Sequence, residues 1–230
     1  MSIYCCSDLH GRYDIWRQIK SFLKPEDKLY YLGDAADRGP NGWKIIKELI
    51  SDNRIIYIKG NHEDMLVKAM KEYIKYDGGY YKDLRLLCSN GGEKTFNDWV
   101  AEGARTEWIK ILDSLPLVRV CGNVQCITIY LSHAGLTPWK GMEIFPSEYD
   151  LLWDRDHYLE DPKEEDLWGI SIHGHTPIPY ILEDLRINEF DGGALWYCCN
   201  HKICLDTGAC FTGSAVLLDL DTFDQHIFEA

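Results

Sequence analysis

Apolar residues in the first 60 positions follow two alternating periodicities. Short apolar runs at 3–6, 28–33 and 54–60 have the length and composition of buried strands. Polar loops follow these runs, and apolar residues then recur at helical spacing near 13–23 and 41–51. This strand, loop, helix and strand order predicts right-handed βαβ units and a parallel sheet with both faces covered.

Helical periodicity dominates from about 62 to 115, which indicates a helical insertion or cap. Strand-like runs return at 117–132, followed by a helical piece near 147–153 and the run WGISIHG. The last 50 residues are expected to form short strands in an antiparallel meander that closes a second sheet. We therefore expect one α/β domain over 1–230, a two-sheet β-sandwich flanked by helices with the insertion at 62–115.

The charge balance is acidic, with 24 Lys and Arg against 37 Asp and Glu and a formal net charge of −13. Binding to nucleic-acid backbones or anionic membranes needs a basic face, so neither partner is expected. No apolar run approaches the roughly 18 residues of a membrane-spanning helix, and the first residues lack the features of a secretory signal.

The nine cysteines do not follow zinc-site spacing, because the chain contains adjacent pairs (Cys5–Cys6 and Cys198–Cys199) and no CxxC. Most lie in strand-like apolar runs, where a reduced cysteine acts as a small hydrophobic residue. We expect them to be buried and reduced, which predicts a cytoplasmic protein.

Polar clusters directly follow five of the expected strands. The carboxyl ends of strands are the usual ligand-binding edge of open α/β sheets. Any one cluster has an ordinary interpretation; in GNHE, for example, Asn61 could cap a helix and Glu63 could lie near its positive end. Five clusters at equivalent strand ends favour a site. The clusters are SDLHG (7–11), GDAADRG (33–39), GNHE (60–63), SHAG (132–135) and HGHTP (173–177).

The clusters supply oxygen and imidazole donors without a thiolate, as in sites for Mn, Fe, Zn or similar ions. Six donors exceed the usual protein complement of one catalytic ion, so two ions are expected, with Asp34 as the shared ligand. Two ions about 3.5–4 Å apart suit phosphoester hydrolysis, because they stabilise both the attacking and the leaving oxygen. The candidate ligands are Asp8, His10, Asp34, Asn61, His133 and His175.

Hydrolysis of a phosphoester also needs positive charge to bind the phosphate oxygens and an acid to protonate the leaving group. Arg38 is suited to grip two phosphate oxygens, and Arg155 is a second candidate whose alternative is a solvated helix end. His62 could protonate the leaving oxygen if a carboxylate holds its ring, and Asp37 is the obvious holder.

In this order, the five motifs resemble the phosphoprotein phosphatase family of calcineurin-like metallophosphoesterases, particularly its small prokaryotic serine/threonine phosphatases. The resemblance implies a four-layer αββα fold, two divalent ions (Mn²⁺ first, with Fe, Zn, Ni, Co or Mg as alternatives) and direct attack on phosphorus by a water between them. It assigns Asp8, His10 and Asp34 to one ion and Asp34, Asn61, His133 and His175 to the other. The resemblance also implies an acid pair, His62 with Asp37. It further implies a phosphate clamp that is formed by Arg38, Asn61 and Arg155.

Departures from the family pattern bear on the substrate. Ser7 replaces the usual glycine of the first motif but is not a ligand position, and the C-terminal tyrosine segment of the eukaryotic members is absent. The related symmetrical diadenosine tetraphosphate hydrolases share HAG and DTG with this chain. They typically lack the aspartate of DRG and carry GNHD, so Asp37, Glu63 and Thr176 favour the protein phosphatase branch.

The sequence thus predicts a metal-dependent phosphomonoester hydrolase acting on phosphoserine or phosphothreonine in proteins, with phosphotyrosine as a further possibility. The alternative is hydrolysis of diadenosine tetraphosphate or another small phosphoester. An inactive metal-binding scaffold is a third hypothesis, and the presence of a residue at every expected ligand and acid position argues against it. The native metal, the substrate and the oligomeric state are not determined by the sequence.

Overall fold

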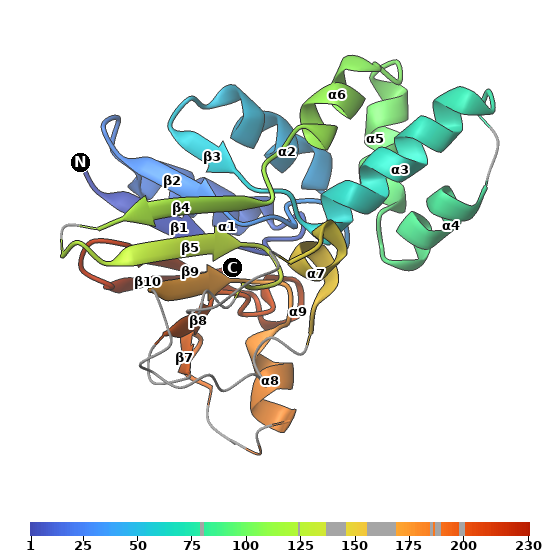
Figure 1. The fold of residues 1–230 in the computed structure, drawn as a ribbon. Coiled ribbons are helices and arrows are strands. Elements are labelled where there is room, and N and C mark those ends of the chain that lie inside the picture. Colours follow the sequence, from blue (N-terminus) through green and yellow to red (C-terminus); the bar gives the residue numbers. More distant parts are fainter. Residues whose placement is uncertain are drawn as a thin grey trace.

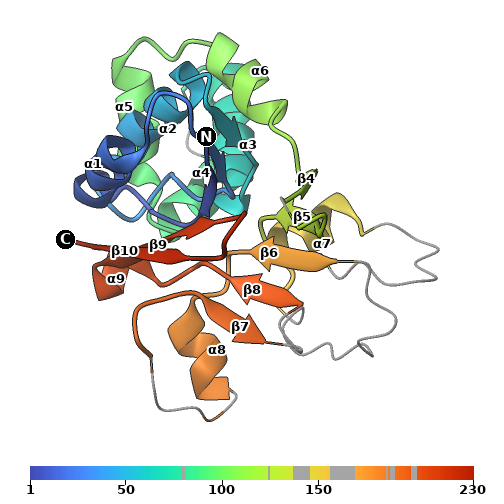
Figure 2. The same ribbon diagram turned by 90° about the vertical axis from the view of Figure 1, so that its left-hand side faces the viewer.

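Two five-stranded mixed sheets form the centre of the molecule (Figure 1). The structure is a computed structural model, and it describes residues 1–78, 81–123, 125–136, 146–155, 169–184, 186, 190–197 and 201–230. Figure 2 shows the sheets lying against each other with helices on their outer sides. The expected two-sheet α/β architecture is therefore confirmed.

The first sheet has the strand order β10-β9-β1-β2-β3. Strands β1, β2 and β3 are parallel, as the βαβ pattern predicts, and β9 and β10 extend the sheet in antiparallel pairing beside β1. The strands span Ile3–Cys6 (β1), Lys28–Tyr31 (β2), Ile55–Tyr57 (β3), Ser214–Asp219 (β9) and Gln225–Glu229 (β10).

The second sheet has the strand order β4-β5-β6-β8-β7. Strands β5, β6 and β8 are parallel, while β4 and β7 are antiparallel edge strands. The strands span Val118–Gly122 (β4), Thr128–Ser132 (β5), Ile170–His173 (β6), Leu195–Tyr197 (β7) and Lys202–Cys204 (β8).

The prediction that the last 50 residues form one meander in the second sheet is wrong. Strand β7 does pair antiparallel with β8, but β8 is parallel to β6, and β9 crosses to the first sheet beside β1. Every residue of β9 is buried, so its apolar run SAVLLD suits an inner strand with both faces covered. Periodicity reveals such a strand but cannot assign it to a sheet.

Helices cover the outer faces of both sheets. Helices α1 (Tyr13–Phe22) and α2 (Gly42–Ser51) lie on the first sheet, and α1 buries its apolar face through Ile15, Trp16 and Ile19. Helix α8 (Ile178–Asp184) packs against Cys204 on the second sheet. A separate apolar cluster fills the space between the sheets, with Leu32, Ile172 and Leu218 among its members. The layers are therefore helix, sheet, sheet and helix.

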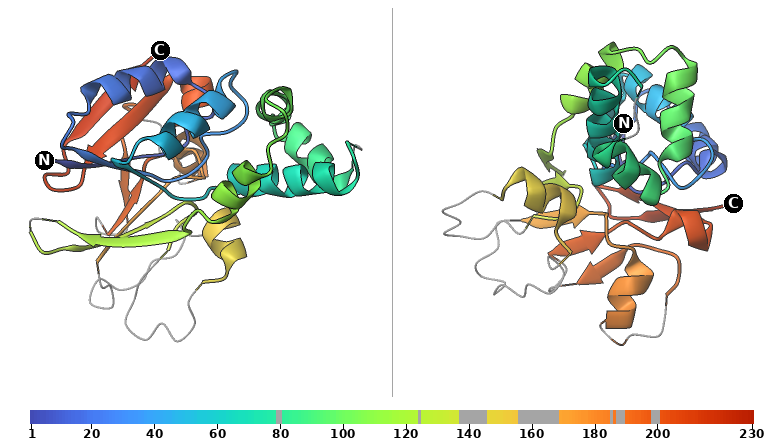
Figure 3. Two further views of the ribbon diagram at one scale, coloured as in Figure 1. Left: turned by 90° about the horizontal axis from the view of Figure 1, so that it is seen from above. Right: turned by 90° about the vertical axis from the view of Figure 1, so that its right-hand side faces the viewer.

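Four helices follow β3 and project beyond the ends of the sheets, as Figures 1 and 3 show from the front and from above. They are α3 (Asn61–Lys75), α4 (Lys82–Ser89), α5 (Glu93–Ala101) and α6 (Glu107–Asp113). Two shorter helices, α7 (Glu148–Trp153) and α9 (Ala209–Thr212), lie at the same end of the strands (Figure 1). In the described part of the chain, no helix combines the length and the apolar character needed to cross a membrane.

The cysteines differ in their exposure. Cys5, Cys6 and Cys204 are buried and free, as expected, and no disulfide joins the seven described cysteines. Cys126 is exposed, so the expectation of burial is wrong for it: it occupies a turn before β5, outside the strand. Cys198 and Cys199 lie outside the described residues.

Candidate metal centre

The ends of strands from both sheets meet where the sequence places its polar clusters. Gly33 follows β2 with a φ of +95°, and a Cβ there would lie 2.6 Å from the Cα of Gly60 and 2.8 Å from Nδ1 of His133. Gly60 follows a strand of the first sheet and His133 follows a strand of the second, so the missing side chain of Gly33 lets the ends of the two sheets approach. The clusters are thus brought to one place by close backbone packing.

Left-handed backbone conformations are concentrated at this place. Asp8, Asp34 and His175 have φ values of 55°, 58° and 68°, although none is a glycine. Such conformations cost free energy and persist where the surrounding structure holds them, often at functional sites. The predicted site residues with positive φ are Asp8, His10, Asp34, Asp37, Arg38 and His175.

In one half of the site, a ring nitrogen that carries a lone pair faces two oxygen atoms that carry no proton. His133 Nδ1 donates to the carbonyl of Leu32 at 2.8 Å, so the lone pair of the neutral ring lies on Nε2. That Nε2 lies 2.9 Å from Asn61 Oδ1 and 3.4 Å from Asp34 Oδ1. Asn61 Oδ1 is also 3.0 Å from Nδ1 of His175. Such a convergence of donor atoms fits a cation between them.

The other half joins β1 to Asp34. His10 Nδ1 donates to the carbonyl of Ala36 at 2.9 Å, which leaves Nε2 free to act as a ligand. This Nε2 lies 3.6 Å from Asp34 Oδ2 and 4.0 Å from Asp8 Oδ1. Asp8 Oδ1 is buried and has no hydrogen-bond partner in the described part of the chain. An orphaned buried carboxylate oxygen is costly unless an ion satisfies it.

The tightest groupings of donor atoms differ in one respect from the predicted ligand sets. Asp34, His133 and His175 group as expected, whereas His10 and Asp34 group with His62 and leave Asp8 outside. His62 Nε2 is 3.8 Å from Asp34 Oδ2, so the predicted acid lies at the edge of the first half-site. Asp34 belongs to both groups, in keeping with the bridging position predicted for it.

Burial sets the charge balance of the site. It raises the pKa of Asp8 and of Asp34 well above the usual range, and neighbouring carboxylates, Asp206 and Glu63 respectively, raise them further. It lowers the pKa of His133 to about 3 and that of His10 well below its usual value. Neutral imidazoles and closely spaced carboxylates are ready to bind cations. When bound, two divalent ions would polarise phosphoryl oxygens and acidify water.

His62 and Asp37 are paired as the sequence predicts. His62 Nδ1 lies 2.7 Å from Asp37 Oδ2, and both side chains are buried. Arg38 Nη2 lies 3.3 Å from His62 Nε2, so the guanidinium and the free ring nitrogen point to the same place. Thr95 of α5 accepts the amide of Asp37 at 3.0 Å and so ties this loop to the projecting helices. The arrangement can present a positive charge and a proton donor to one phosphate.

Arg155 lies after α7 and is exposed. Burial is the largest cause of the lowered pKa values of His133 and His175, and the positive charge of Arg155 lowers both further. Arg38 thus follows a strand of the first sheet, whereas Arg155 follows α7, which lies in the chain between two strands of the second sheet.

Glu63 has a larger role than the sequence indicated. The ordinary interpretation of GNHE places Glu63 near the positive end of a helix, and its side chain does accept the amide of Gly60 at 3.0 Å. It also accepts the amides of Asp34, Ala35 and Ala36, at 2.8, 3.0 and 3.2 Å. One buried carboxylate therefore holds two of the metal-site loops. Spacing along the chain gives no signal of contacts across 29 residues.

Asp206 was not identified from the sequence as a site residue. It follows β8 as the other clusters follow their strands, and it is 2% exposed. The signal available in the sequence is its position directly after a strand-like run, as in the other clusters.

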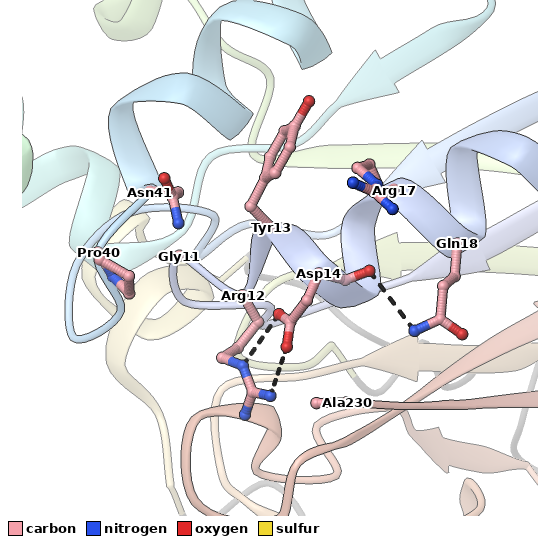
Figure 4. A pocket seen from close by; sticks show the side chains of 9 residues that line it. All are labelled: Gly11, Arg12, Tyr13, Asp14, Arg17, Gln18, Pro40, Asn41 and Ala230. Carbon is pink, nitrogen blue, oxygen red and sulfur yellow. Dashed lines mark hydrogen bonds and ion pairs between the residues drawn. The ribbon is translucent and has the colours of Figure 1, made fainter.

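A pocket of about 590 Å³ lies at the start of α1, and Gly11, which follows His10 in the chain, is among its lining residues (Figure 4). It is lined by Arg12, Tyr13, Arg17 and Asn41, among others. Arg12 forms an ion pair with Asp14, whereas Figure 4 draws no such contact for Arg17. The pocket is open to solvent and offers positive charge next to the loop that carries His10.

A family model described as calcineurin-like phosphoesterase matches residues 1–205. An Anoxybacillus flavithermus protein named bis(5'-nucleosyl)-tetraphosphatase PrpE [asymmetrical] is 24% identical over 215 residues, which cover 83% of this chain and 74% of that protein. A Buchnera aphidicola protein named bis(5'-nucleosyl)-tetraphosphatase, symmetrical, is 30% identical over 142 residues. That match covers 60% of this chain, which thus spans less than half (46%) of the Buchnera protein.

Solved structures share the fold. A Sphaerobacter thermophilus metallophosphoesterase superposes with a TM-score of 0.58 at 18% identity, covering 100% of this chain and 88% of that one. A cold-active protein-tyrosine phosphatase of a Shewanella species superposes with a TM-score of 0.60 at 15% identity, covering 99% and 80%. At these identities the likeness concerns the fold alone.

Proposed function

Because the chain belongs to the calcineurin-like phosphoesterase family, we propose that it is a metal-dependent hydrolase that cleaves dinucleoside tetraphosphates. The observation that carries this proposal is the pair of relatives described above, both named as tetraphosphatases and matched over much of the chain. This reverses the order of preference that Asp37, Glu63 and Thr176 gave in the sequence. We propose Mn²⁺ as the first metal to test.

Each site residue has a role in the proposed reaction. Asp8, His10, Asp34, Asn61, His133 and His175 would hold the two ions. Arg38 and Arg155 carry the charge that binds and orients the scissile phosphate, together with the Asn61 amide. His62 delivers a proton from Nε2 to the leaving oxygen, while Asp37 fixes its ring through Nδ1 at 2.7 Å.

The pocket at the start of α1 supports a long substrate. A dinucleotide needs space for a nucleoside beyond the scissile phosphate, and about 590 Å³ lies next to the His10 loop. We place the distal nucleotide there, with Arg17 as a contact for its phosphates. Arg17→Gln should then raise KM for the dinucleotide and leave KM for p-nitrophenyl phosphate unchanged.

A specific observation also favours the second candidate, dephosphorylation of proteins. A serine alkoxide is a poor leaving group that needs a proton, and the buried His62–Asp37 pair is suited to supply one. A nucleotide phosphate leaves with less assistance. The His62–Asp37 pair therefore supports protein phosphatase activity as the second candidate function.

Turnover of diadenosine tetraphosphate and of phosphoserine, phosphothreonine and phosphotyrosine peptides tests the proposal directly. The protein would be freed of metal with a chelator and assayed with Mn²⁺, Co²⁺, Mg²⁺ and Zn²⁺, with Asp34→Asn as the inactive control. We expect kcat/KM for the dinucleotide to exceed that for the best peptide by about tenfold or more. A reverse preference would select the protein phosphatase, and inactivity on both classes with every metal would refute both.

Product analysis separates the two modes in the relatives' names. Symmetrical cleavage of diadenosine tetraphosphate yields two molecules of ADP, whereas asymmetrical cleavage yields ATP and AMP. Chromatography of the nucleotides after partial turnover distinguishes them.

A further inference from the structure

Asp206 occupies the position in the second sheet that corresponds to a predicted ligand on the neighbouring strand. Strands β6 and β8 are parallel, with His173 opposite Cys204 in the register. His175 and Asp206 each follow that pair by two residues, so both come directly after the same end of neighbouring strands. The backbone supports this placement, because the amide of Leu205 donates to the carbonyl of His173 at 2.8 Å.

The Asp206 carboxylate is only half satisfied. Oδ1 accepts the amide of Gly208 at 2.9 Å. Oδ2 is buried and has no hydrogen-bond partner among the described residues, as is also true of Asp8 Oδ1. Two unpaired carboxylate oxygens in one buried region indicate a positively charged ligand there.

Asp206 is also electrostatically coupled to residues of the candidate metal centre. After burial, the Asp206 charge is the largest cause of the raised pKa of Asp8, ahead of Asp34. Arg38, Arg155 and His62 stabilise the Asp206 charge in turn, and burial still raises its pKa to about 6. The charged groups that act on this carboxylate are thus residues of the candidate site.

We propose that Asp206 is a further carboxylate of the metal centre, which strengthens divalent-cation binding on the side formed by Asp8 and His10. Cation binding there relieves the repulsion between Asp206 and Asp8 and satisfies the free Oδ2. The proposal depends on the metal centre and is independent of the substrate. It can therefore be tested without turnover.

Metal titration of Asp206→Asn provides the test. Asparagine keeps the size and the Oδ1 acceptor for Gly208 but removes the charge. Calorimetric titration of the chelator-treated protein with Mn²⁺ should show one of the two ions bound about 10- to 100-fold more weakly than in the wild type, and the other nearly unchanged. Unchanged affinity for both ions would overturn the proposal.

Asp219→Asn is the matched control. Asp219 is also buried and accepts backbone amides in a turn, from Asp221 and Thr222. It pairs with Tyr4 near the start of β1, at the end of that strand away from Asp8. This variant should bind both ions as the wild type does, so equal weakening in the two variants would show a nonspecific effect of charge.

Thermal unfolding separates a role at the metal centre from a structural one. In chelator, Asp206→Asn should unfold at a temperature equal to or above that of the wild type, because a buried repulsion with Asp8 is removed. With saturating Mn²⁺ its melting temperature should rise less than that of the wild type. A variant that is less stable in chelator, or that does not fold, would show that Asp206 is structural and would contradict the proposal.

Discussion

Glu63 holds Asp34 in place: Oε2 of Glu63 accepts the backbone amide of Asp34 at 2.8 Å. The same carboxylate accepts the amide of Gly60 at 3.0 Å, so it joins the loop after β2 to the start of α3. Asp34 Oδ1 in turn accepts the amide of His62 at 3.0 Å. The position of the bridging carboxylate thus depends on contacts with α3 as well as on its own strand.

Glu63→Gln should destabilise the protein by about 2–4 kcal/mol, because one acceptor oxygen of a buried charged group is replaced by an amide that faces N–H donors. It should also weaken metal binding. Urea unfolding and metal content measure the two effects.

Glu72→Gln is its control on the same helix, since Glu72 accepts the amides of Asp83 and Leu84 far from the site. We expect a smaller loss of stability there and normal metal content. If Glu63→Gln retained both metals, Glu63 would have no part in positioning Asp34.

Asp34→Asn should lose both ions together. Asp34 Oδ1 faces His133 and Oδ2 faces His10, at 3.4 and 3.6 Å, so a change here affects both halves of the site. Elemental analysis after dialysis checks this outcome. Retention of one full equivalent of metal would mean that the halves do not share Asp34.

Gly174→Ala should remove metal from the Asp8 side. The added Cβ would fall within van der Waals overlap of Asp8 Oδ2 and Ser7 Oγ, so the carboxylate must move. Gly122→Ala is the control, because the nearest atom to its Cβ, the carbonyl oxygen of Ile127, is 3.7 Å away. Mn²⁺ titration should distinguish the variants, and wild-type affinity in Gly174→Ala would rule out the predicted displacement.

His62→Asn should retain metal and reduce turnover of poorly activated phosphoesters by about 10²–10⁴. The loss should shrink for p-nitrophenyl phosphate, whose leaving group needs little protonation. Asp37→Asn should act in the same direction, because Asp37 fixes the His62 ring. A series of aryl phosphates with different leaving-group pKa values measures this dependence, and equal losses across the series would exclude His62 as the acid.

His173 should make the metal-free protein less stable in acid. Burial lowers the pKa of His173 to about 4, while the ring in the unfolded chain has its ordinary value of about 6.5. Between these values the unfolded state binds more protons, so this contribution to the unfolding free energy falls as the pH decreases from about 6.5 to about 4. The full change is roughly 3 kcal/mol.

The comparison with His173→Gln isolates this contribution, because the other titrating groups are common to both proteins. Urea unfolding in chelator at pH 7 and pH 5 should show the advantage of the wild type decreasing at pH 5. A difference that is independent of pH would show that His173 does not change its protonation on unfolding.

Sequence alone predicts the repeating βαβ units, the helical nature of the segment after β3 and the polar residues at the strand ends. These features are local, because side-chain periodicity and glycine-rich corners depend on near neighbours along the chain. Asp34, His62 and Asp37 could be identified from such corners, and the structure brings them together.

The choice of which strands share a sheet and which buried groups face one another becomes visible in the three-dimensional packing. Strand β9 joins β1 across more than 200 residues, and Glu63 reaches the amide of Asp34 across 29. Asp206 reaches the site because β8 lies parallel to β6. Such contacts depend on how apolar faces pack between layers, and a one-dimensional pattern does not specify that choice.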